Sequence, residues 1–223
     1  VSSGAVNLWD VRTGEIAATL PGARAAEVPV AFSPDGRRLA AGGGDGVLRL
    51  WDVASRREIA ALVGHQKGIS CVAFSPNGKT VVSGSRDGTV KLWRPAPKPQ
   101  AILPGTPGGI YQIVVSANGK TLASGNRNGV IALWDVRRER LIRAFKAHTG
   151  DVRSLAFSPD GRRLASWGAD ARGRIWDLPT GHLSLTLPRR PAAFSPDGSL
   201  LACAGNGNDR TIHLWNLAAG RDE

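Results

Sequence analysis

A tryptophan that recurs about every 41 residues constrains the fold of this chain more than any other feature. Each of these residues closes a short run rich in Leu and β-branched residues: Trp9, Trp51, Trp93, Trp134, Trp176 and Trp215. A second marker, Phe-Ser-Pro-Asp/Asn-Gly, keeps the same period and begins at Phe32, Phe74, Phe157 and Phe194, with the weaker Val115-Ser-Ala-Asn-Gly119 between. Two markers with one period predict a protein built from repeats.

Between the markers the sequence consists of short alternating runs separated by turn residues such as Pro-Asp-Gly and Pro-Asn-Gly. Such runs are typical of antiparallel strands, and no stretch keeps a helical period. Each unit therefore holds about four strands, for example Ile69–Ser75, Thr80–Ser85, Thr89–Trp93 and Glu58–Val63. One sheet of this size cannot bury both of its faces, so we expect the units to stack side by side.

A four-stranded unit that ends in Trp-Asp, with Gly-His before the next unit, resembles the WD40 repeat of β-propellers. Gly64-His65 carries this dipeptide, and Ala147-His148 keeps its His. The resemblance covers nearly the whole chain and implies an all-β propeller of four-stranded antiparallel blades in one domain, residues 1–223. The expected units are residues 1–22 (partial), 23–64, 65–105, 106–147, 148–187 and 188–223 (partial).

The two end units are expected to be incomplete. Eight residues precede Trp9, so the first unit should lack its first strand and most of its second; eight follow Trp215, so the last unit should lack its last strand. Regular blades of this number do not close a ring of six or seven, and the chain does not begin with Met. We therefore expect a fragment of a longer propeller, with a seven-bladed parent as our hypothesis.

Two units carry a His, a Ser, an Asp and a Trp at the same spacing: His65, Ser83, Asp87 and Trp93, and then His148, Ser166, Asp170 and Trp176. A Ser, a His and an Asp can form a hydrolase triad, but a catalytic site is normally single and this set is repeated. The resemblance implies a structural network instead, in which Asp binds His, and Ser joins His to the Trp indole. We expect no catalytic residue and no enzyme activity.

Cofactor and metal sites are not indicated. The glycine clusters at residues 42–46 and 205–207 lack a following Gly-Lys-Ser/Thr, so they predict turns rather than phosphate loops. The four His residues do not pair at helical spacing, and neither Cys71 nor Cys203 has a second ligand at zinc spacing. No signal peptide and no long apolar run is seen, which favours a cytoplasmic protein without a membrane segment.

The formal charge of +11 has a predicted location. Arginine pairs recur in corresponding turns, and we expect them to form a basic rim on one side of the blades: Arg37, Arg38, Arg56, Arg57, Arg137, Arg138, Arg162 and Arg163. Such a rim could bind nucleic acid or another polyanion. Against this, no aromatic residue is interleaved with the pairs, and an Asp accompanies each Phe-Ser-Pro-Asp-Gly turn.

The opposite side is where the family resemblance implies partner binding. The corresponding positions precede the turn Asp or lie four and six residues before the Phe marker: Tyr111, Arg153, Arg86, Arg127, Asp151, Ser70, Arg190 and Asn208. Tyr and Arg are typical interface anchors, so Tyr111, Arg153 and Arg86 are the preferred candidates; plain exposed loop residues are the alternative. The resemblance thus implies a non-catalytic platform that binds another protein. A Pro-rich segment at residues 94–101 predicts a stiff loop or a weak docking ligand.

Overall fold

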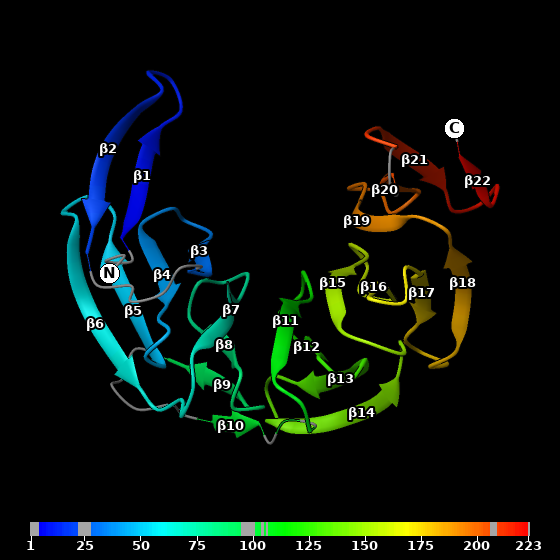
Figure 1. Ribbon diagram of the computed structural model, residues 1–223, viewed down its shortest axis with the longest axis horizontal. Helices are drawn as coiled ribbons and strands as arrows, with labels where there is room; N and C mark the ends of the chain where they lie inside the picture. Colours follow the sequence, from blue (N-terminus) through cyan, green and yellow to red (C-terminus); the bar gives the residue numbers. More distant parts are fainter. Residues whose placement is uncertain are drawn as a thin grey trace. The chain divides into compact units, whose positions relative to one another are not determined.

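The computed structural model describes residues 5–21, 28–94, 101–103, 105, 107–205 and 209–222. The regular structure of these residues is entirely β-strand, which confirms the predicted all-β class. Among them, no helix has the length and the apolar character that crossing a membrane requires. The chain forms two compact units, Val1–Gly105 and Thr106–Glu223 (Figure 1), and the division falls between two predicted repeats.

The first unit contains a hairpin and two four-stranded antiparallel sheets. The hairpin is β1 (Val6–Asp10) and β2 (Glu15–Leu20). One sheet consists of β3 (Val30–Phe32), β4 (Arg38–Gly42), β5 (Val47–Asp52) and β6 (Arg57–Val63). The next consists of β7 (Ile69–Phe74), β8 (Val81–Ser85), β9 (Val90–Trp93) and β10 (Ala101–Leu103). Leu20 of the hairpin packs with Leu39 and Trp51, which attaches the hairpin to the sheet β3–β6.

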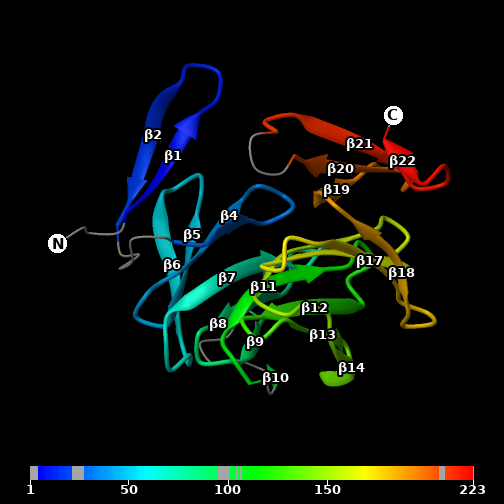
Figure 2. The ribbon, with the colours of Figure 1, turned by 45° about the vertical axis from the view of Figure 1, so that its right-hand side comes forward.

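The second unit contains three sheets with the same order of strands. They are β11 (Ile110–Val115), β12 (Thr121–Asn126), β13 (Val130–Asp135) and β14 (Arg140–Lys146); β15 (Val152–Phe157), β16 (Arg163–Gly168), β17 (Gly173–Asp177) and β18 (Leu183–Leu187); and β19 (Arg190–Phe194), β20 (Leu200–Ala204), β21 (Ile212–Asn216) and β22 (Arg221–Asp222). Within each sheet, consecutive strands are neighbours, as Figure 2 shows for β11 to β13.

One prediction about the end units is wrong. The last unit does not lack its outer strand, because β22 pairs with β21 through Trp215↔Asp222 and Asn216↔Arg221. The chain reverses tightly after Asn216, whose side-chain oxygen accepts the backbone N–H groups of Ala218 and Ala219. Gly220, with φ +67°, completes this turn, so a few residues are enough for a short strand.

Neighbouring sheets within each unit stack through repeated hydrophobic clusters. The cluster between β3–β6 and β7–β10 includes Leu50, Leu62 and Trp93. The cluster between β11–β14 and β15–β18 uses matching positions, among them Phe145 and Trp176. Burying one such side chain contributes roughly 1.5–3 kcal/mol, so stacking supplies what a single sheet cannot.

The two ends of each sheet carry different turns, and this separates the predicted surfaces. The registers Arg38↔Asp52 and Asp52↔Arg57 bring the turn between the first two strands and the turn between the last two to one end, here called the rim end. The turn between the second and third strands lies at the other end, here called the network end. Asp87 and Asp170 belong to turns of this second kind.

Candidate functional site

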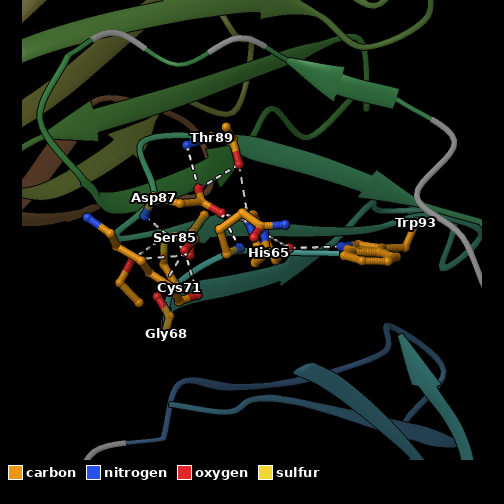
Figure 3. A network of polar contacts seen from close by, with 12 residues as sticks. His65, Gly68, Cys71, Ser85, Asp87, Thr89 and Trp93 are labelled. Atoms are coloured by element: carbon orange, nitrogen blue, oxygen red, sulfur yellow. Dashed lines mark hydrogen bonds and ion pairs between the residues drawn. The ribbon is translucent and has the colours of Figure 1, made fainter. Parts of the chain in front are cut away.

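The polar set of the sheet β7–β10 forms one continuous chain of hydrogen bonds (Figure 3). His65 Nδ1 lies 2.9 Å from Asp87 Oδ2, and His65 Nε2 lies 2.8 Å from Ser83 Oγ. The indole N–H of Trp93 donates to the same Ser83 oxygen at 2.8 Å. Thr89 donates its hydroxyl to Asp87 at 2.6 Å, which adds a bond at the network end. The four predicted residues are therefore linked by hydrogen bonds although they lie far apart in the sequence.

The order of donors follows from this arrangement. Since the Ser83 oxygen accepts from Trp93, its own proton is directed to His65 Nε2, and His65 Nδ1–H donates to Asp87. Burial lowers the pKa of His65 despite the nearby carboxylate, which favours the neutral imidazole. Burial alone would raise the pKa of Asp87, but hydrogen bonds from Thr89, Gln66 and His65 lower it to about 2. The pair is thus a neutral His bound to a carboxylate.

The sheet β15–β18 repeats this geometry. His148 Nδ1 lies 2.9 Å from Asp170 Oδ1, and His148 Nε2 lies 2.8 Å from Ser166 Oγ. Trp176 donates its indole N–H to Ser166 at 2.9 Å. Burial again lowers the pKa of His148; it would raise that of Asp170, but hydrogen bonds from His148 and Arg174 lower the Asp170 pKa to about 2.

The serine hydroxyls of the network are not accessible to a substrate. Ser83 and Ser166 are both 0% exposed, and each hydroxyl lies between an imidazole and an indole. A serine nucleophile must reach a substrate carbonyl, and these two oxygens have no exposed surface from which to do so. Among the described residues, no three His, Cys, Asp or Glu side chains gather in a group that could hold a metal ion.

The other sheets replace the missing members with other partners. In the sheet β11–β14, Trp134 still donates to Ser124 at 3.1 Å, while Asn128 donates its side-chain amide to the Pro107 carbonyl at 2.8 Å. In the sheet β19–β22, Cys203 pairs with His213 as Ser83 pairs with Lys91, so Cys203 occupies the position of the serine. The buried Trp215 indole N–H is the one buried side-chain nitrogen or oxygen without a partner among the described residues. The tryptophan hydrogen bond is therefore kept in the sheet β11–β14 and lost in the sheet β19–β22.

Sequence reasoning missed a cationic residue four positions after the turn Asp. Arg49 contacts Asp45 at 2.8 Å, and Arg174 contacts Asp170 at 2.8 Å. His213 contacts Asp209 at 2.8 Å. The signal was present in the sequence, because this Asp-x-x-x-Arg/His spacing occurs in three of the units. Asp209 also contacts Arg189 at 2.8 Å, in a unit that has no equivalent of His65 or His148, and no spacing indicated that pair.

Acid should weaken both networks. Because burial lowers the folded-state pKa of His65 and His148, the unfolded chain binds their protons first as the pH falls through the ordinary histidine range. We expect the free energy of unfolding to drop by up to about 1.4 kcal/mol per pH unit for each histidine, and to drop again below about pH 4 as Asp87 and Asp170 are protonated in the unfolded chain. Urea unfolding followed by tryptophan fluorescence at about pH 7.5, 5 and 3 measures this. A His182→Gln chain is the control: because His182 is exposed, its replacement should leave the change of midpoint with pH unaltered. Equal wild-type midpoints at the two higher pH values would contradict the expectation.

The arginine pairs lie at the rim end of their sheets, each beside a carboxylate. Arg138 contacts Asp135 at 2.9 Å, and the Arg37 backbone N–H donates to Asp35 at 3.1 Å. Hydrogen bonding by Ser33, and then the Arg37 backbone, lowers the pKa of Asp35. The remaining predicted rim residues lie in the corresponding turns or at the strand ends beside them: Arg38, Arg56, Arg57, Arg137, Arg162 and Arg163. The rim is therefore partly neutralised by its own turns.

The predicted partner-binding residues lie toward the network end of their sheets. Tyr111 is 38% exposed, and the Arg127 guanidinium carbon lies 5.7 Å from the centre of its ring. Arg153 and Arg190 are also exposed in the second unit, and Asp151 is half-buried. In the first unit Arg86 is exposed, whereas Ser70 is half-buried and donates to the Gly84 carbonyl at 3.1 Å. Asn208 lies outside the described residues.

Residues 1–222 match the family described as the IFT122 first beta-propeller. The chain is 37% identical over 86 residues to human WD repeat-containing protein 36, covering 37% of this chain and 10% of that protein. It is 34% identical over 95 residues to the APC/C activator protein CDC20 of Saccharomyces cerevisiae, covering 39% and 15%. It is 34% identical over 90 residues to the guanine nucleotide-binding protein subunit beta of Arabidopsis thaliana, covering 36% and 24%. The matched stretches thus span at most 24% of these relatives.

Proposed function

Because the chain belongs to the WD40-repeat β-propeller family, we propose that it is a rigid, non-catalytic platform that binds another protein. Two relatives are named as an activator of the APC/C and as a subunit of a guanine nucleotide-binding protein. Both names describe proteins that work together with other proteins. This supports a protein partner for the present chain.

The observation that carries the proposal is the contact between Tyr111 and Arg127. An exposed aromatic ring with a guanidinium 5.7 Å from its centre presents a large surface that is already held in place. Such a surface loses little side-chain entropy on binding, which is why Tyr and Arg dominate the strongest contacts of protein interfaces. Arg153 and Arg190 add positive charge in the same unit. A partner with acidic groups around an apolar contact fits this composition.

The burial of Ser83 and Ser166 supports the non-catalytic part. The Ser, His and Asp residues that could suggest a hydrolase triad are members of a network that occurs twice, with hydroxyls that are fully buried. A repeated and buried arrangement is what a scaffold needs, because satisfied polar groups hold a sheet rigid.

The test compares capture of a partner by the wild-type chain and by a Tyr111→Ala, Arg153→Glu variant. We expect the bound partner to fall at least about tenfold, since loss of one interface anchor commonly costs 2 kcal/mol or more. A matched control, Leu141→Ala, Arg138→Glu, makes similar changes at the rim end and should keep binding. Thermal unfolding should be unchanged by the first variant, because both side chains are exposed.

Two results would contradict the proposal. One is equal capture by the wild-type chain and by the Tyr111→Ala, Arg153→Glu variant. The other is a nucleic-acid partner whose binding falls steeply with salt and is lost when Arg37, Arg38, Arg162 and Arg163 are neutralised, which would assign function to the basic rim.

A further inference from the structure

A pocket of about 390 Å³ lies in the first unit, between the sheets β3–β6 and β7–β10. Its volume is within the range of roughly 300–1,000 Å³ that ligand pockets occupy. Its apolar lining comes from β5, β6, β8 and β9: Leu50, Ile59, Ala60, Ala61, Leu62, Val81 and Trp93. Its polar lining lies at the rim end of the two sheets: Arg38 begins β4, Lys79 precedes β8 and Arg94 follows β9. The pocket is therefore distant in the sheet from Arg86 and from the proposed interface.

The matching junction of the second unit shows what fills this space. There, Phe145 of β14 stands at the position of Leu62 and packs against Trp176, with 4.7 Å between ring centres. Arg143 stands at the position of Ala60, donates to the Thr180 carbonyl at 3.4 Å, and covers Gly181. The first junction has the smaller Leu62 and Ala60, and therefore an opening where the second has an aromatic side chain.

The rim-end part of the pocket lining is basic. Arg38 and Lys79 line it from two neighbouring sheets, and Arg94 lines it at the end of β9. Among the described residues, no Asp or Glu lines the pocket. Glu58 of β6 directly precedes the lining residues and is exposed, but it is not among them. An apolar lining with cationic groups at the rim end complements an apolar side chain that is flanked by carboxylates.

Strand β6 gives this opening an edge to which an extended chain can add. Among the described strands, β6 pairs only with β5, so its other edge keeps unpaired backbone groups. Outer strands are usually protected by charge, as β14 is by Arg140, Arg143 and Lys146. The second part of β6, from Ile59 to Val63, has no charge, and these two end residues are 53% and 64% exposed.

We propose that this pocket binds an acidic partner peptide, which lies extended along β6 and inserts one aromatic side chain between the two sheets. The side chain would take the place that Phe145 has in the second unit, and the flanking carboxylates would meet Arg38 and Lys79. This is strand addition with one specificity pocket. The chain's own Pro-rich segment at residues 95–100 is a poorer occupant, since it has no acidic and no aromatic residue and contains Lys98.

The test uses the full chain and a fluorescein-labelled Gly-Glu-Glu-Phe-Glu-Glu-Gly peptide, with binding followed by fluorescence anisotropy. We expect saturable binding that weakens at least about tenfold when Phe in the peptide is replaced by Ala, because burial of that ring is lost. An Ala60→Arg, Leu62→Phe chain copies the second junction and should lose binding to a similar degree. Ile59→Glu is a second variant that changes an exposed residue and should also lose binding.

Matched controls come from the equivalent positions of another repeat. Ile142→Glu alters a residue of β14 that is 57% exposed, at the position that Ile59 has in β6, and should leave peptide binding unchanged. Lys79→Glu should weaken binding several-fold, whereas Lys120→Glu, in the same Asn-Gly-Lys turn of the next repeat, should not. Each control makes the same change of charge as its pocket variant and leaves the pocket lining unaltered.

Three outcomes would overturn the inference. No binding to the wild-type chain is the first. Equal binding of the Phe and Ala peptides is the second, since it would mean general attraction of polyanions to the basic rim. Binding only after residues 95–100 are replaced by a Gly-Ser segment is the third, since the chain's own segment would then be the occupant. All are independent of the Tyr111 and Arg153 test, which concerns the network end.

Discussion

Replacing Gly129 by alanine is expected to lower the free energy of unfolding by about 4 kcal/mol. Gly129 has φ +73°, a conformation that costs a residue with a Cβ about 1–2 kcal/mol. A Cβ there would also overlap the backbone carbonyls of His148 and Gly150, and backbone atoms cannot move aside as a side chain can. The His148 N–H donates to the Gly129 carbonyl at 3.0 Å, so a displaced residue 129 would also shift the imidazole in its network.

Gly161→Ala is the control for this experiment. Gly161 lies in the same unit and has φ +69°, but its nearest neighbour to a Cβ would be the Asn118 side chain at 3.8 Å. Gly161→Ala should lower the free energy of unfolding by about 1 kcal/mol, from backbone strain alone. Urea unfolding followed by tryptophan fluorescence compares the two chains. Equal losses would show that the contact with His148 is not what makes Gly129 necessary.

Replacing Asp87 by alanine is expected to cost about 3 kcal/mol of stability. The change leaves His65 Nδ1–H, the Thr89 hydroxyl and the Gln66 N–H without their acceptor. The His65 side chain is 0% exposed and cannot turn to water, and each buried group without a partner costs about 1–3 kcal/mol. Asp87→Asn should lose less, because the amide oxygen can still accept from His65.

Asp45→Ala is the matched control in the neighbouring sheet. Asp45 has the same place in its turn, but its side-chain partner is Arg49 and both side chains are partly exposed. We expect a loss of about 1 kcal/mol or less, as for most exposed ion pairs. If Asp87→Ala instead left the chain fully stable and abolished a turnover that the wild-type chain catalyses, the network would be a catalytic site and the proposed function would be wrong.

The repeat markers predicted the fold because they are the residues that stacking requires. Trp93 and Trp176 are at matching positions in the sheet-to-sheet clusters, so their spacing reports directly on the size of one sheet. The alternation of β7, β8 and β9 gave their bounds to within two residues at each end. Outer strand β22 was missed because it has two residues and arises from the turn at Asn216, which no hydrophobic alternation reports.

The candidate site was only partly predictable. The His, Ser, Asp and Trp that bond in one chain keep fixed spacings, so repetition made them visible. The pocket left no such sign, because Ala60 and Leu62 are ordinary residues for a strand and only comparison with Arg143 and Phe145 across the matching junction reveals the missing volume. The ion pair between Asp209 and Arg189 could not be predicted, because no repeated spacing in the sequence marks it.

The unpaired indole N–H of Trp215 makes the sheet β19–β22 less stable than the other two sheets of the second unit. The sheets β11–β14 and β15–β18 fasten their tryptophans to serines, but the sheet β19–β22 does not, and it ends in a two-residue strand with Ile212 78% exposed. In a stack where each repeat holds only its neighbours, opening starts at the weakest member. Amide hydrogens of β21 should therefore exchange faster, through local opening, whereas those of β12 and β16 should exchange only when the whole unit unfolds.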